Sequence, residues 1–258
     1  AVYQDVNGGA GGTISITCGA IEGSGTIDAT TQSAYGGTQG GGGRVAIIFD
    51  TAEQAKLPVP SGMEYSADCG PLQPPGDTEF VQARPGTLYF SSDALIDRTG
   101  CALFGALDFA NVTDTWTIES FRMTNGWAAL ARDSVEMRVT GDFEITGASQ
   151  VNRRMSATNV RDPRANGTRW EVGGTGTYCL TNLLCFMQAS ATAPRLTVGG
   201  DFKVSNLGVV MVWPSQTAMN PAAALAVLTI RGTQSEAYRA YARQGGQNGF
   251  WQWFAQER

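Results

Sequence analysis

The chain has 258 residues, of which 42% are hydrophobic and 16% are charged, so it can bury a substantial core. Its formal net charge of −5 disfavours nucleic acid and anionic membranes as partners, and we expect no membrane insertion because no apolar run is long enough to span a bilayer. The chain contains no histidine, which excludes a Ser-His-Asp triad, a Cys-His dyad and any histidine-ligated metal site within it.

The first fifty residues alternate short apolar segments with glycine. The three segments are residues 8–16 (GGAGGTISI), 23–29 (GSGTIDA) and 40–48 (GGGGRVAII). Residues 13–17 alternate β-branched and small side chains, as a strand with one buried face does. Glycine between such strands permits a tight turn or the close approach of a second backbone. The repetition predicts strands that coil into a β-solenoid.

Residues 51–86 differ from this pattern because they are rich in proline. The prolines are Pro58, Pro60, Pro71, Pro74, Pro75 and Pro85. Since proline cannot donate a hydrogen bond to a strand ladder, we expect a long excursion here rather than central strands. Residues 86–90 (GTLYF) then begin a new strand.

Regular alternation of apolar residues returns from about residue 115. The strongest internal match aligns residues 139–143 (VTGDF) with residues 198–202 (VGGDF). Equivalent positions at Val139, Val172, Val198 and Ile230 give irregular steps of the size of one solenoid coil, with variable loops between them.

These patterns predict an all-β fold, with residues 1–232 forming a right-handed parallel β-helix with irregular loops. A β-sandwich is the alternative. In a sandwich we would expect hairpin turns of the Asn-Gly or Asp-Gly type between most strands, whereas here single or paired glycines separate the strands.

Residues 233–258 form a separate carboxyl-terminal tail. Residues 234–243 are compatible with a short helix that Gly245 and Gly246 end, and an aromatic segment follows. The aromatic residues are Phe250, Trp251, Trp253 and Phe254. A solenoid exposes strand edges at its ends, so this tail is either a cap or a segment that docks into a neighbouring subunit. Capping within the chain needs no partner, which favours the cap.

The five cysteines are Cys18, Cys69, Cys101, Cys179 and Cys185. No Cys-x-x-Cys pair occurs, which argues against a zinc ribbon. Two disulfides and one thiol are possible in an oxidising compartment, with Cys179 and Cys185 as neighbours across a tight turn. Alternatively, all five are small buried hydrophobic residues.

A cluster of arginines is the main candidate for binding an anionic partner. It consists of Arg153, Arg154, Arg161, Arg164 and Arg169. Guanidinium groups pair with carboxylates and sulfates, so the cluster can bind an acidic polysaccharide or an acidic neighbour. The surrounding asparagine, proline and glycine residues indicate a loop, and a solvated loop with scattered charges is the favoured interpretation.

Carboxylates and tryptophans are the remaining candidates. Asp142 and Asp201 occupy equivalent repeat positions, and β-helix hydrolases and lyases use clustered carboxylates. Each follows a glycine at a turn into a strand, where aspartate more often bonds the local backbone, so we expect a structural role. Tryptophans are expected in the core, with Trp251 and Trp253 as exceptions. No catalytic residue, metal site or cofactor is predicted.

The glycine-rich segments resemble a repeat family of large secreted bacterial surface proteins. In that family, a GGxGGxIxI strand precedes GxGxIxA and GGGGRIAI strands and, after a spacer, a GTIYL strand. Residues 8–16, 23–29, 40–47 and 86–90 match in that order, so the resemblance covers roughly the first ninety residues. Such proteins are similar to autotransporter-like and filamentous-adhesin-like β-helices, which implies an exported, cell-surface or matrix role and carries no catalytic residues.

The resulting functional expectation is a non-enzymatic extracellular or cell-surface protein that self-assembles into an oligomer or filament, as a surface-layer, sheath, fibre or adhesin subunit. The alternative is a β-helix that binds or cleaves polysaccharide, a lyase or glycoside hydrolase, with a groove lined by Arg153, Arg154 and Arg169. A third interpretation is a passive piece of a larger exported protein.

Overall fold

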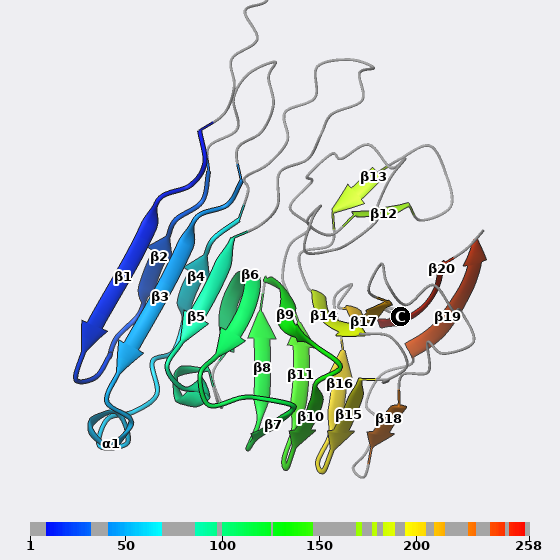
Figure 1. The fold of residues 1–258 in the computed structure, drawn as a ribbon. Helices are drawn as coiled ribbons and strands as arrows, with labels where there is room; N and C mark the ends of the chain where they lie inside the picture. Colours follow the sequence, from blue (N-terminus) through cyan, green and yellow to red (C-terminus); the bar gives the residue numbers. More distant parts are fainter. Residues whose placement is uncertain are drawn as a thin grey trace, which may run out of the picture.

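The computed structural model consists mostly of β-strands in parallel sheets, with almost no helix among the described residues (Figure 1), which confirms the all-β prediction. The structure describes residues 9–31, 41–68, 86–96, 100–124, 126–146, 169–171, 177–179, 183–188, 194–204, 209–214, 227–230, 238–245 and 248–255. Three runs of parallel strands, named ladders A, B and C below, organise these residues.

Ladder A is the longest run of parallel strands. It contains β1 (Thr13–Cys18), β3 (Arg44–Phe49), β5 (Thr87–Phe90), the second half of β6 (Gly100–Phe109), β9 (Trp127–Asp133), β14 (Leu183–Gln188) and β17 (Val209–Pro214). Strand β3 shows why these segments are strands, because Val45, Ile47 and Phe49 are buried while Arg44 and Ile48 are exposed. Such alternation matches the two-residue period of a strand.

Ladder B faces the same core from another side. It contains β2 (Gly25–Asp28), β4 (Met63–Ser66), the first half of β6, β8 (Phe121–Thr124), β11 (Phe143–Thr146) and β16 (Phe202–Val204). Strand β6 passes from ladder B to ladder A at Gly105, whose φ of 150° is accessible to glycine and strained for other residues.

Ladder C contains β7 (Thr115–Ile118), β10 (Glu136–Val139), β15 (Arg195–Val198) and β18 (Val227–Ile230). The register pairs Val139 with Val198 and Val198 with Ile230, as the internal repeat predicted. Val172 lies outside the described residues. The strand before it, β12 (Arg169–Glu171), pairs antiparallel with β13 (Thr177–Cys179) and does not join ladder C. In that ladder β10 pairs directly with β15.

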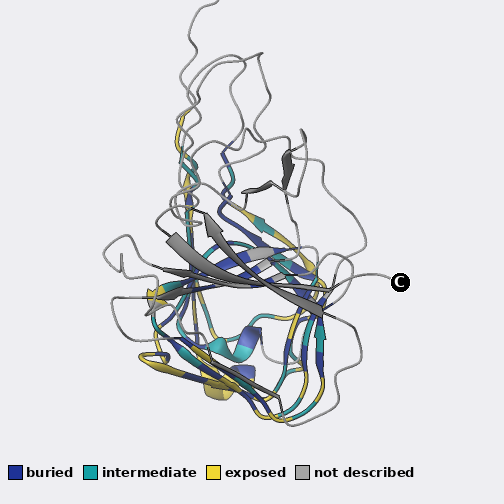
Figure 2. Cartoon of the chain, turned by 90° about the vertical axis from the view of Figure 1, so that its right-hand side faces the viewer, coloured by how far each residue is buried: buried dark blue, intermediate teal, exposed yellow. Residues whose placement is uncertain are grey.

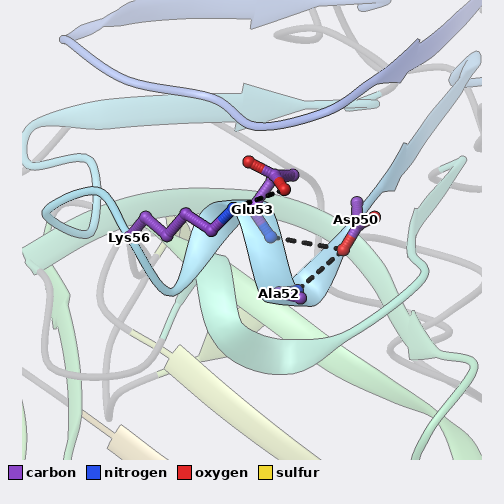
Figure 3. Close-up of polar contacts among 4 residues, drawn as sticks. All are labelled: Asp50, Ala52, Glu53 and Lys56. Atoms are coloured by element: carbon purple, nitrogen blue, oxygen red, sulfur yellow. Dashed lines mark hydrogen bonds and ion pairs between the residues drawn. The ribbon is translucent and has the colours of Figure 1, made fainter.

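Among the described residues, two short helices lie where the chain leaves ladder A in its first part. They are α1 (Thr51–Gln54) and the 3₁₀ helix η1 (Asp93–Leu95). Asp50 caps α1, because its carboxylate accepts hydrogen bonds from the backbone N–H groups of Ala52 and Glu53, and Glu53 also pairs with Lys56 (Figure 3). Beyond these helices, strands of ladders A, C and B follow one another along the chain.

A continuous row of aromatic rings fills the space between the ladders. Neighbouring ring centroids are 4.9 to 5.8 Å apart along Tyr65, Phe90, Phe109, Trp116, Phe121, Phe143 and Phe202. The core location expected for tryptophan is confirmed at Trp116, which is 1% exposed and donates a hydrogen bond from Nε1 to Asp93. Figure 2 shows buried and exposed positions alternating along the strands around this core.

The proline-rich excursion is narrower than the sequence predicted, because β4 lies within residues 51–86. No proline occurs between residues 61 and 70, and Met63 and Tyr65 alternate with Glu64 in a strand that pairs with β2. Residues 69–85, which contain the remaining prolines, lie outside the described part.

The helix predicted at residues 234–243 is wrong where the structure describes the segment. Strands β19 (Tyr238–Gly245) and β20 (Asn248–Ala255) form an antiparallel pair, and β20 pairs with β17. We call β19 and β20 the carboxyl-terminal hairpin. The hydrogen-bonding groups along the last strand of ladder A need partners, and this tertiary demand overrides the weak local helical pattern. Two adjacent glycines suit a hairpin connection as well as a helix end.

Candidate functional site

The first strands of ladders A and B form an open edge. Among the described residues, β1 pairs only with β3 and β2 pairs only with β4. Figure 1 shows β1, in dark blue, as the outermost strand of its ladder. We refer to the outer sides of β1 and β2 together as the open edge.

Backbone geometry determines which groups this edge presents. The N–H of Arg44 donates to the carbonyl of Gly12 over 2.9 Å, with Arg44 opposite Thr13. In a parallel ladder, successive residues direct both backbone groups to alternate sides. The even-numbered residues of β1 therefore bond β3, whereas the N–H and C=O groups of Thr13, Ser15 and Thr17 point away from it. These outward groups are a template for a further strand.

The inward side chains at the open edge are incompletely covered. Ile14, Cys18 and Ile27 pack against the core and remain only half-buried. Their register partners one strand further in are buried, namely Val45, Phe49 and Tyr65. The open edge is thus also the open end of the hydrophobic core, where added cover would gain free energy from apolar burial.

Glycines hold the backbones of ladders A and B in contact near this edge. The N–H of Gly43 donates to Ala29 over 3.1 Å, and the N–H of Gly86 donates to Ala67 over 2.7 Å. A Cβ atom on Gly43 would lie 2.5 Å from the carbonyl oxygen of Ala29 and closer still to that of Gly12. The close backbone approach predicted from the glycine-rich segments is therefore confirmed at Gly43.

Gln54 fixes the connection between β1 and β2. Its side chain is 3% exposed, accepts a hydrogen bond from the N–H of Ile21 over 2.8 Å and donates one to the carbonyl of Ile21 over 3.0 Å. The side-chain amide of Gln54 therefore pairs with both backbone groups of Ile21, as a neighbouring strand would do. Helix α1, which follows β3, therefore holds the segment between β1 and β2 in place.

The carboxylates of ladder B have structural contacts. Asp142 accepts a hydrogen bond from the backbone N–H of Asp201 over 2.8 Å, in the neighbouring layer of the ladder. Asp142 therefore bonds a backbone group, as expected, but the partner is 59 positions away rather than in the local turn. Burial, and secondly the Cys101 thiol, raise the pKa of Tyr65, so this phenol stays neutral at physiological pH.

Glu144 joins three strands of ladder B on their outer face. Its carboxylate contacts Arg122 over 2.5 Å and Lys203 over 3.1 Å, and the register places the three residues side by side. Burial raises the pKa of Glu144, but the hydrogen bonds from Lys203 and Arg122 outweigh it and hold the pKa below its usual value. These ion pairs hold neighbouring strands of ladder B together. A general acid needs a raised pKa, whereas the pKa of Glu144 is lowered.

We expect Glu144→Gln to lower the free energy of unfolding by at most about 1 kcal/mol at pH 7, because both cations are partly exposed. A carboxyl group with a lowered folded-state pKa stabilises the protein above its unfolded pKa of about 4.3, and the effect is lost as the pH falls through the folded-state pKa. Urea denaturation of both proteins between pH 7 and pH 3 tests this. A difference that persists unchanged at low pH would contradict it.

Several residues predicted from the sequence lie outside the described part. Arg153, Arg154, Arg161 and Arg164 are not described, and for Arg169 only its place on β12 is. Cys179 and Cys185 lie on β13 and β14, but their side chains are not described, so their disulfide stays a prediction. The anion-binding role of the arginines also stays a prediction.

The aromatic tail residues are placed by their strand. Phe250, Trp251, Trp253 and Phe254 lie on β20, and the register pairs Trp251 with Val212 and Trp253 with Val210. Their segment therefore covers the edge of β17 within the same chain. The open edge at the other end was missed as a site, although the alternation in residues 13–17 marks the strand that forms it.

Within the described ranges, no group of cysteine, aspartate and glutamate side chains is arranged to hold a metal ion. Among the same residues, no helix has the length and hydropathy needed to cross a membrane. No family model, curated protein or solved structure matches the chain.

Proposed function

We propose that this chain is a right-handed parallel β-helix that does structural work at the cell surface or outside the cell, as a self-assembling surface-layer, sheath, fibre or adhesin subunit. The observation that carries the proposal is the open edge. Among the described residues, β1 and β2 have no strand on their outer sides and lie over a half-covered part of the core. Proteins normally protect such edges, so this arrangement favours association with another chain.

The order of the strands supports a β-helix. From β9 onward, apart from the β12–β13 pair, the strands up to β17 belong in turn to ladders A, C and B and then return to ladder A, and each pairs in parallel with its counterpart one turn away along the chain. A β-sandwich is built mainly from antiparallel neighbours, which here are limited, among the described strands, to β12–β13 and the carboxyl-terminal hairpin with β17. The hand follows the general preference for right-handed connections between parallel strands.

The extracellular setting is supported by the resemblance to glycine-rich repeats of secreted bacterial surface proteins. The strands β1, β2, β3 and β5 each overlap one of the four segments that carry the resemblance. Structural work rather than catalysis is supported by the contacts of Asp142 and Glu144, because both carboxylates are engaged in holding neighbouring strands together.

Electron microscopy of the native, unreduced protein, combined with sedimentation velocity over a range of concentrations, tests the proposal. We expect regular filaments or lattices and a sedimentation coefficient that rises with concentration. Dispersed particles of one chain each at all concentrations would contradict self-assembly. Screening the same sample against acidic polysaccharides would then test the alternative function, with the arginine cluster as the expected contact.

A further inference from the structure

We propose that copies of this chain join head to tail, with β19 of one copy pairing in parallel with β1 of the next. The inference rests on the proposed self-assembly. It adds which strands of neighbouring copies contact each other and that all copies point in the same direction. Four features of the molecule support it, namely the open edge, the carboxyl-terminal hairpin, the directions of their strands and the charges at the two ends.

The two strands lie at opposite ends of one strand order. Ladder A begins at β1 and ends at β17, and β20 and β19 continue it in that order (Figure 1). Among the described residues, β19 pairs only with β20, so it too has an outer side. The lengths are compatible, because β1 has six residues and β19 has eight.

The strand directions also match. Strand β20 runs antiparallel to β17, and β19 runs antiparallel to β20. Two reversals return β19 to the direction of β17, which is the direction of all of ladder A, including β1. A second copy displaced along the ladder therefore presents β1 to β19 in parallel, the same arrangement in which β1 already pairs with β3.

The backbone and the core of β1 gain from this contact. The outward N–H and C=O groups of Thr13, Ser15 and Thr17 would be satisfied by a parallel strand, as their even-numbered neighbours are by β3. The half-buried Ile14 and Cys18 would receive the cover that Val45 and Phe49 have in the next layer.

The formal charges at the two ends are opposite. Residues 9–31 contain Glu22 and Asp28 and no lysine or arginine, which gives −2. Residues 238–255 contain Arg239 and Arg243 and no acidic residue, which gives +2. Opposite charges favour head-to-tail association, whereas contact between two like ends brings like charges together.

The polarity distinguishes a filament from a closed dimer. Two copies that pair β1 with β1 about a two-fold axis would place these strands antiparallel and bring together two acidic ends. A contact between different surfaces repeats along an axis and gives an open fibre unless its rotation closes a ring. We therefore infer a second copy, in polar orientation, as the occupant of the open edge.

Ser15→Pro tests the contact. The N–H of Ser15 points away from β3, so proline removes a donor from the open edge and leaves the pairing with β3 in place, as edge strands tolerate. We expect the protein concentration needed for assembly to rise at least about tenfold. Ser15→Ala, which keeps the N–H, is the matched control and should assemble like the unmodified chain. Circular dichroism and thermal unfolding check that both variants fold.

Charge reversal tests polarity independently of proline. The double variants Glu22→Lys with Asp28→Lys, and Arg239→Glu with Arg243→Glu, each give a chain with two ends of the same sign. Neither should assemble alone, and an equimolar mixture should form mixed fibres, because every contact then joins opposite charges.

The outcomes separate the inference from the proposed function. An unmodified chain that never assembles contradicts both. Assembly that persists unchanged in the folded Ser15→Pro variant, or in both charge-reversed variants alone, overturns the inference and leaves self-assembly standing. Closed dimers in place of fibres also overturn it. Loss of assembly in Ser15→Pro and in each charge-reversed variant alone, with recovery of fibres when the two charge-reversed variants are mixed, supports the head-to-tail contact.

Discussion

Gly43→Ala should lower the free energy of unfolding by about 3 kcal/mol or more, because the added methyl group collides with backbone atoms that cannot move independently. Its Cβ would meet the carbonyl oxygens of Gly12, which directly precedes β1 of ladder A, and of Ala29, which directly follows β2 of ladder B. Relief of the collision requires separating β1 from β3 or ladder A from ladder B. Guanidinium denaturation measures the loss, and hydrogen exchange should show that residues 13–18 lose protection first.

Gly12→Ala is the matched control for Gly43→Ala. No atom lies within 4 Å of a Cβ placed on Gly12, which is exposed. We expect the free energy of unfolding to change by no more than about 1 kcal/mol, because the added methyl group meets no atom and alanine restricts the unfolded chain. Equal effects of the two substitutions would contradict the claim that close backbone contact, rather than glycine content, holds the first layers together.

Phe143→Ala should lower the free energy of unfolding by about 3–5 kcal/mol. The ring is fully buried and stacks between Phe121, at 5.3 Å, and Phe202, at 5.2 Å. Its loss leaves a cavity in the middle of the aromatic row and removes contacts to the layers on both sides. In a stack of repeated layers, weakening one interface divides the structure, so we also expect a broader denaturation transition.

Phe143→Leu separates the effect of volume from that of ring stacking. Leucine fills most of the site and should cost about 1–2 kcal/mol, since packing is largely kept and the ring contacts are lost. Equal losses for leucine and alanine would show that the stacked geometry, not the filled volume, stabilises this position. A negligible loss for alanine would contradict the placement of Phe143 in the core.

Local sequence patterns were informative wherever one strand sufficed to produce them. The alternation at residues 13–17 predicts which side chains face inward, because a strand has a period of two residues and one buried face. The repeat at Val139 and Val198 predicts their pairing, because stacked layers place like residues next to each other. Glycine at residue 43 predicts close backbone contact, since only glycine leaves room for it.

Contacts between side chains on neighbouring strands could not be predicted from these local patterns. Glu144 meets Arg122 and Lys203, and Asp142 meets the backbone of Asp201, across insertions of unequal length. Alternation shows which side of a strand is buried, but it does not show which strand lies beside it. The same limit applies to the candidate site, because an edge is open only if no other segment pairs with it.

Local sequence patterns were enough to predict short, glycine-separated strands with one buried face. Pairing with neighbouring strands makes β4 a strand within a proline-rich stretch and makes the tail a hairpin instead of a helix. Both outcomes have one physical reason. The backbone groups of a strand must be paired by its neighbours, and which neighbours are present is a property of the whole fold.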